Sequence, residues 1–206
     1  MSDHARLALH DVSGSLQDLL QKLEGDQGPI WANAFKRFLR KENPWQNNLS
    51  YNGNVDFPAR SESFTAKDYF QIRSGVFVWD GFKNRILRTA VKADSTPATS
   101  LACFDLVKDT PDEQIRAELP EDHVFQDASV FCSHLAGMID RQPNGKEGSL
   151  LNDGYANVFY VQGSYEVVAV SVHWVADFRG WSVCACELDV SAWPAGYRAF
   201  SATAVA

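Results

Sequence analysis

The chain lacks any long apolar run, and its first residues lack the features of a secretory signal. The longest apolar stretch, residues 167–175, includes Ser171 and His173. A transmembrane helix needs about 20 apolar residues, so this stretch is far too short. Residues 1–4 are polar and mildly acidic, and no apolar segment follows them. We therefore expect a cytoplasmic protein that does not enter a membrane.

Cysteine is scarce as well. Four cysteines in 206 residues are too few for the disulfide frameworks that stabilise small secreted domains. We expect free, buried thiols, because unpaired cysteine behaves as a small apolar residue. The chain has no C-x-x-C pair, so a zinc site is only weakly indicated and no metal is expected.

Basic residues are few in the second half of the chain. The net charge is −7, from 19 Lys and Arg against 26 Asp and Glu. Residues 1–90 hold 12 basic and 10 acidic side chains, whereas residues 91–206 hold 7 and 16. Binding to nucleic-acid phosphates needs clustered Lys and Arg, so the charge argues against a general nucleic-acid partner. A protein partner remains open, as does the oligomeric state.

Several motifs with a known chemical role are also missing. The chain contains no phosphate-binding glycine loop, no dinucleotide fingerprint, no H-E-x-x-H pair and no G-x-S-x-G elbow. Each of these motifs places specific groups on a cofactor, a metal or a nucleophile. No cofactor is therefore expected, and the case for an enzyme is weakened.

Apolar spacing and turn residues predict the elements that are present. Helices are predicted over residues 15–23, 29–42, 80–93, 111–119 and 127–141. Strands are predicted over residues 69–79, 101–107, 157–162, 165–175, 181–188 and 197–201.

The order of these elements predicts an α+β fold. Helices dominate the start of the chain, helices and strands mix in the centre, and an antiparallel sheet with a meander over 157–188 closes it. The length fits one domain, residues 1–206. Residues 1–45 form a candidate helical annex, and residues 46–66, rich in Asn, Gly, Pro and Ser, are predicted to be an irregular connector.

The register between the last two long strands decides which reactive side chains meet. A five-residue turn, 176–180, would place Cys184 and Cys186 on the core face and His173 on the opposite face. A four-residue turn would bring His173 to the cysteine face, because a register shift of one residue moves every side chain of a strand to the opposite face of the sheet. We expect the five-residue turn.

Under that register Glu187 shares the face of His173. The imidazole is then a candidate general base and the carboxylate its orienting partner, as in a small hydrolase-like enzyme. The competing interpretation is a histidine packed on a half-covered sheet face. The absence of an identifiable nucleophile favours this second interpretation.

The turn itself offers a binding surface. Asp177 and Arg179 place two opposite charges at one end of the sheet, and Phe178 and Trp181 place two aromatic rings there. Aromatic residues and arginine are common in binding hot spots. The same residues also suit a tight turn with a local ion pair. The leading hypothesis is a non-catalytic binding or interaction module that uses this turn and the exposed side of the sheet.

A basic segment gives a third hypothesis. Arg37, Arg40 and Lys41 lie on one side of a predicted helix, and Trp45 follows it. Cations with a neighbouring aromatic ring could bind RNA or a nucleotide over residues 36–45. The charged side of an amphipathic helix has the same appearance, and the overall acidity favours that explanation.

Four segments carry a resemblance to other sequences. Residues 38–45, 118–125, 152–161 and 195–201 resemble a group of uncharacterised hypothetical proteins from bacterial genomes. The likeness covers most of the chain. It implies a single bacterial domain without a transport signal, and it implies no activity, ligand or site residue.

Overall fold

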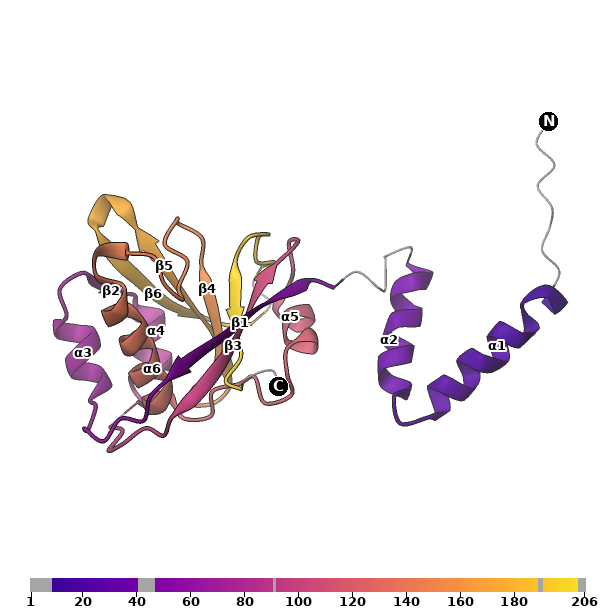
Figure 1. The fold of residues 1–206 in the computed structure, drawn as a ribbon, viewed down its shortest axis with the longest axis horizontal. Coiled ribbons are helices and arrows are strands. Elements are labelled where there is room, and N and C mark those ends of the chain that lie inside the picture. Colours follow the sequence, from indigo (N-terminus) through magenta and orange to yellow (C-terminus); the bar gives the residue numbers. More distant parts are fainter. Residues whose placement is uncertain (1–8, 41–46, 91, 189–190, 204–206) are drawn as a thin grey trace. The chain divides into compact units, whose positions relative to one another are not determined.

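The chain forms two compact units, residues 1–47 and 48–206. The computed structural model describes residues 9–40, 47–90, 92–188 and 191–203. The first unit contains helices α1 (Leu9–Glu24) and α2 (Gly28–Leu39). The second contains a mixed β-sheet with the remaining helices (Figure 1). The α+β class predicted from the sequence is confirmed.

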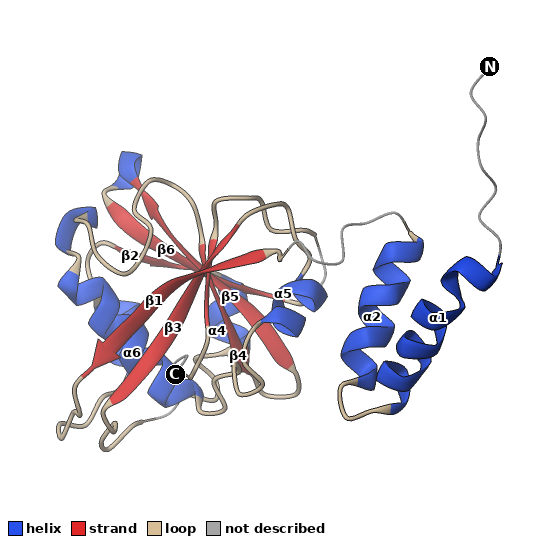
Figure 2. Cartoon of the chain, turned by 45° about the vertical axis from the view of Figure 1, so that its right-hand side comes forward, coloured by secondary structure: helices blue, strands red, loops and turns tan. Residues whose placement is uncertain are grey.

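The sheet of the second unit has seven strands in the order β1-β3-β7-β4-β5-β6-β2, which Figure 2 shows as one twisted sheet. The meander β4–β5–β6 is antiparallel, as predicted. Two parallel pairs, β4 with β7 and β2 with β6, make the whole sheet mixed. The strands are β1 (Leu49–Phe57), β2 (Val76–Val78), β3 (Thr99–Leu106), β4 (Asn157–Gln162), β5 (Val167–Val175), β6 (Gly180–Cys186) and β7 (Arg198–Phe200).

Four α-helices and two short 3₁₀ turns connect these strands in the described part of the second unit. The helices are α3 (Ala66–Ile72), α4 (Asp80–Arg85), α5 (Asp112–Glu118) and α6 (Ala128–Arg141), and the turns are η1 (Pro143–Gly145) and η2 (Ala176–Phe178). Helix α6 begins where it was predicted, because the Asp127 carboxylate accepts hydrogen bonds from the N–H groups of Ser129 and Val130.

Three predicted elements are wrong in part. The predicted irregular connector contains strand β1, which pairs with β3. Its polar side chains gave no apolar pattern that would predict a strand. Within the predicted strand 69–79, the first residues belong to α3, because Ala66 and Phe70, four residues apart, pack into the core from one helical face. Helix α4 ends at Arg85 rather than at residue 93.

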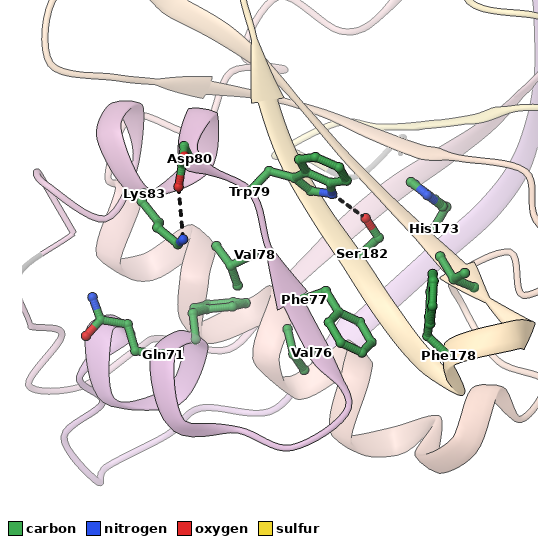
Figure 3. A pocket seen from close by; sticks show the side chains of 12 residues that line it. Gln71, Val76, Phe77, Val78, Trp79, Asp80, Lys83, His173, Phe178 and Ser182 are labelled. Atoms are coloured by element: carbon green, nitrogen blue, oxygen red, sulfur yellow. Dashed lines mark hydrogen bonds and ion pairs between the residues drawn. The ribbon is translucent and has the colours of Figure 1, made fainter.

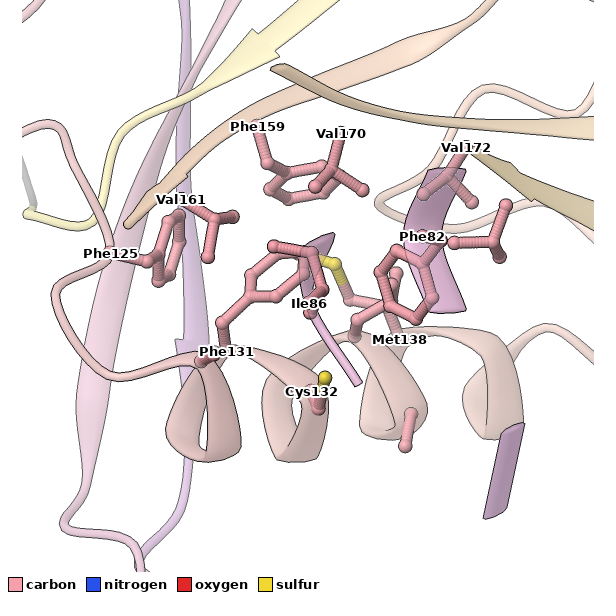
Figure 4. Close-up of a cluster of buried hydrophobic side chains, with 14 of the residues drawn as sticks. Phe82, Ile86, Phe125, Phe131, Cys132, Met138, Phe159, Val161, Val170 and Val172 are labelled. Carbon is pink, nitrogen blue, oxygen red and sulfur yellow. The ribbon is translucent and has the colours of Figure 1, made fainter. Parts of the chain in front are cut away.

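One face of the sheet is covered by α6 together with α3 and α4. Figure 4 shows side chains of α6 pointing up at the sheet, with Phe131 against Phe159 and with Phe82 and Ile86 filling the layer beside them. The rings of Phe131 and Phe159 meet edge to face, with centroids 5.4 Å apart. This layer is the main hydrophobic core, and its burial supplies most of the driving force for folding.

The opposite face is covered by α5 and by the segment around Trp193. The buried Asp112 carboxylate holds both in place, since it accepts hydrogen bonds from the Tyr160 hydroxyl (2.8 Å) and the Trp193 indole N–H (2.6 Å). Helix α5 begins after Pro111, its N-cap, which has no side-chain capping bond, and the neighbouring Thr110 hydroxyl donates to the Lys108 carbonyl.

No helix in the described ranges is both long enough and apolar enough to cross a bilayer.

The close approach of α4 to β6 depends on Gly81, and this gives a test of the fold. A Cβ atom at residue 81 would lie 2.2 Å from the carbonyl oxygen of Ala185. We expect Gly81→Ala to lower the free energy of unfolding by about 1–3 kcal/mol, because the helix must move off the sheet. Urea denaturation measures the change.

Gly137→Ala is the matched control, because Gly137 lies in α6 and its Cβ would meet the Phe57 ring at an ordinary 3.7 Å. This variant should be neutral or stabilising by up to about 1 kcal/mol from helix propensity. Equal destabilisation by both variants would contradict the close packing of α4.

Candidate functional site

The second sheet face is covered over only part of its width. The side chains beneath α5 come from β3, β7, β4 and the start of β5, and Ala169 and Cys186 lie at the border of that cluster. Beyond this border Ser171, His173 and Cys184 are only half buried. The end of the sheet formed by β5, β6 and β2 therefore has one open face.

The register of β5 and β6 is the one that a four-residue turn produces, and it differs from the prediction. Val175 pairs with Gly180 and His173 with Ser182, so the turn has four residues, 176–179. The chain reverses one residue early because residues 176–178 form a 3₁₀ turn and Arg179 adopts a left-handed conformation with φ 49°. The predicted five-residue turn is wrong.

This register moves His173 to the cysteine face and separates it from Glu187. Ser171 pairs with Cys184, and Ala169 with Cys186, so these side chains share the open face with His173. Glu187 instead binds Arg85, at 2.6 Å. The predicted general base with its orienting carboxylate, His173 and Glu187, is therefore wrong on geometric grounds.

The electrostatics of His173 agree with this geometry. Burial alone lowers the pKa of the imidazole below its usual value of 6.5. A neighbouring carboxylate would raise that pKa instead. The imidazole of the folded protein is thus neutral at physiological pH, with no acidic residue among the causes of its shift.

The thiols on this face are weak nucleophiles. Burial raises the pKa of Cys184 and of Cys186 above the ordinary value, and a protonated thiol reacts poorly. None of the four cysteines forms a disulfide. Although His173, Cys184 and Cys186 share a face, no three His, Cys, Asp or Glu side chains converge as a metal site in the described parts of the chain.

The most conspicuous side chains on the open face are aromatic. Phe77 in β2, Trp79 after it and Phe178 in the turn are 46%, 62% and 69% exposed. The Phe77 and Phe178 rings meet edge to face, with centroids 5.8 Å apart. The Trp79 indole N–H donates a hydrogen bond of 2.9 Å to the Ser182 hydroxyl and so lies over β6 (Figure 3).

These aromatic rings border a cavity of about 880 Å³ around β2. His173, Val175 and Ser182 complete the lining on the open face, and Figure 3 shows His173 beside Phe178. Residues from α3 and α4 line the cavity on the other side of β2, among them the ion pair of Asp80 and Lys83 at 3.0 Å. The cavity is thus mostly apolar, with polar groups at a few points, as binding sites commonly are. We call it the β2 groove.

The predicted turn residues divide between the two faces. Asp177 and Arg179 are exposed, as a binding loop requires. Trp181 is 2% exposed and packs edge to face on Trp174, 5.4 Å away, on the core face of the sheet. The prediction that Trp181 belongs to an exposed binding surface is therefore wrong, and the exposed aromatic ring of the turn is Phe178.

Phe77 and Trp79 were not predicted as site residues, whereas Phe178 was recognised as one of the two aromatic rings of the turn. The alternation within residues 76–79 was the available signal, since it places Phe77 on the face opposite Val76 and Val78. The strand was recognised, but which of its faces is open depends on the extent of α5, which is a tertiary property.

The predicted basic segment is described only in part. Arg37 lies in the last turn of α2 and is half buried, and Arg40 is the exposed C-cap of that helix. Lys41 and Trp45 lie outside the described residues. These residues belong to the first unit, whereas the β2 groove lies in the second.

Comparisons with protein-family models, with curated proteins and with solved structures found no match to the chain. Any functional assignment therefore has to come from the chemistry of the site itself.

The pKa of His173 gives a test of the open face. Because folding lowers this pKa, the unfolded chain binds a proton more readily as the pH falls below 6.5. We therefore expect His173 to lower the free energy of unfolding as the pH falls below 6.5. His173→Asn should make the free energy of unfolding less dependent on pH between about pH 7 and 5.

Urea denaturation at several pH values measures the slope, and an NMR titration of the imidazole measures the pKa directly. Burial likewise lowers the pKa of His123 and His134, so some slope should remain in the variant. An imidazole that titrates at or above 6.5, with an unchanged slope in His173→Asn, would contradict the burial of this side chain.

Proposed function

We propose that the protein is a non-catalytic binding module of the cytoplasm that holds an extended, apolar segment of a partner protein in the β2 groove. The observation that carries the proposal is the cluster of exposed aromatic rings, Phe77, Trp79 and Phe178, beside the last strand of the sheet. Large aromatic patches of this kind are common at protein interfaces.

The backbone of β2 supports a partner in extended conformation. The Gly75 carbonyl accepts a hydrogen bond from Trp181 N–H (2.8 Å), and Trp79 N–H donates to the Val183 carbonyl (3.0 Å). Hydrogen bonds alternate along an edge strand, so the N–H and C=O groups of Val76 and Val78 point away from β6. An added strand can bind these groups, and pockets for its alternate side chains give specificity.

The opposite edge of the sheet is less suited to such an addition. Strand β1 has an irregular register between Tyr51 and Gly53, and Gly53 adopts φ 116°. Irregularities of this kind and charged side chains such as Asp56 discourage pairing with another strand. Strand β2 has no bulge in its register with β6. These differences favour β2 over β1 as the edge to which a partner strand is added.

The charge of the second unit and the chemistry of the open face disfavour the two other hypotheses, a nucleic-acid binder and a hydrolase. The second unit holds 13 basic and 20 acidic residues, a balance of −7, which disfavours nucleic acid as the partner. A hydrolase would need an activated nucleophile beside His173. The half-buried thiols of Cys184 and Cys186 have raised pKa values and are not activated, and the Ser182 hydroxyl accepts a hydrogen bond from the Trp79 indole.

Selection from a library of short random peptides displayed on phage tests the proposal. We expect the selected peptides to alternate apolar and polar residues, and to bind Trp79→Ala and Phe178→Ala about tenfold or more weakly. That factor corresponds to about 1.4 kcal/mol, within the range of hot-spot aromatics. Fluorescence polarisation of a labelled peptide measures the affinity.

Tyr165→Ala is the control, because Tyr165 is 99% exposed and does not line the groove. It should leave the affinity unchanged. Failure to enrich any peptide, or equal affinity for wild type and both aromatic variants, counts against the proposal.

Strand addition predicts a separate effect of the backbone. Val78→Pro removes the outward N–H while keeping the hydrogen bonds that β2 makes with β6. The loss of one such bond, about 1 kcal/mol, should weaken peptide binding about fivefold. Val78→Ile, which keeps the N–H, serves as the control. Should Val78→Pro fold normally by circular dichroism and bind as wild type does, the partner contacts side chains only.

A further inference from the structure

The first unit is a helical hairpin. Three residues, 25–27, separate α1 from α2, and Gly28 N–H donates to the Gly25 carbonyl at 2.8 Å. A Cβ at residue 28 would lie 2.3 Å from the Leu23 carbonyl oxygen, so glycine is needed for this close turn. The contact of the Lys22 ammonium with the Trp31 ring, 4.4 Å from its centroid, joins the two helices.

The hairpin leaves much of its apolar surface uncovered. Leu19, Leu23, Trp31 and Phe35 are half buried. A second set of large apolar side chains is exposed by 43–67%: Leu16, Leu20, Ile30, Phe38 and Leu39. Two helices of 16 and 12 residues cannot bury a core of their own, and units of this size usually need a partner.

The charges of the two helices indicate what that partner is. In helix α1, Asp18 and Glu24 outnumber Lys22, which pairs with Asp18 at 2.7 Å and leaves an acidic excess. Helix α2 contains Lys36 and Arg37 and no acidic residue. In a two-fold bundle of two hairpins, each α1 lies between the α2 of its own chain and the α2 of the other. In each pair of neighbouring helices one is then acidic and the other basic, which favours association of two hairpins.

An anionic membrane surface fits these charges less well. The basic helix would be attracted to it, but the acidic residues of α1 on the same small unit would be repelled. A second copy of the hairpin satisfies both helices at once.

We propose that the chain forms a homodimer through residues 9–40, with the two hairpins packed as a four-helix bundle around the exposed apolar side chains. Such bundles pack their apolar stripes against one another with short connections between antiparallel helices. The proposal is independent of the β2 groove, since it uses only residues of the first unit.

Sedimentation velocity of the full chain over a range of micromolar concentrations tests the proposal. We expect a monomer–dimer equilibrium in the wild type. Leu20→Glu and Phe38→Glu should each raise the dimer dissociation constant at least tenfold, because a charge is placed in the apolar seam. Phe178→Glu, an equally exposed aromatic residue of the second unit, is the matched control and should leave the dimer intact.

Charge reversal tests the pairing without disturbing the apolar seam. Asp18→Lys with Glu24→Lys in α1, or Lys36→Glu with Arg37→Glu in α2, should weaken the dimer. All four substitutions together should recover affinity, because α1 is then basic and α2 acidic. A wild type that stays monomeric at every concentration overturns the proposal. So does dissolution of the dimer by Phe178→Glu, or a monomer that cosediments with phosphatidylserine vesicles through the hairpin.

Discussion

The chain reversal between β5 and β6 determines what the open face of the sheet presents. Arg179 in the left-handed region costs about 1–2 kcal/mol, and it shortens the turn to four residues. Gly180 then pairs with Val175, and the absence of a side chain at 180 admits the Phe77 ring, because a Cβ there would lie 2.5 Å from the ring atom Cε2. One turn thus sets the register of β6 and allows β2 to lie against it.

A second constraint limits how far the other face is covered. The Asp112 carboxylate binds both Tyr160 and Trp193, and this fixes the short α5 over the middle of the sheet. Since α5 spans only Asp112–Glu118, it does not reach β2. The open face is a consequence of that length, and aromatic rings occupy it where a longer helix would have covered the sheet.

The sequence allowed helix α6 and the β4–β5–β6 meander, which form the main core, to be predicted, but not the site. Phe131, Leu135 and Met138 recur at helical spacing, and turn residues flank each apolar run of the meander. The local sequence pattern was therefore sufficient to predict these elements. The turn at Arg179 was missed because a left-handed arginine has no local signature. Strand β1 was missed because its polar residues pair with β3, a partner some 50 residues away in sequence.

A dimer of this chain would bind a partner with two extended segments more tightly than a single β2 groove can. A three-residue strand and a few aromatic rings form a small interface, and small interfaces bind weakly. A dimer joined through the hairpins would carry two β2 grooves, one in each second unit. A partner with two extended segments would then bind the second groove at a high effective concentration, without any additional contact in either groove. Dimerisation through residues 9–40 does not use the backbone of β2, whereas pairing of two β2 strands would close that edge. For this reason a binding edge and a distinct dimerisation unit are compatible in one chain.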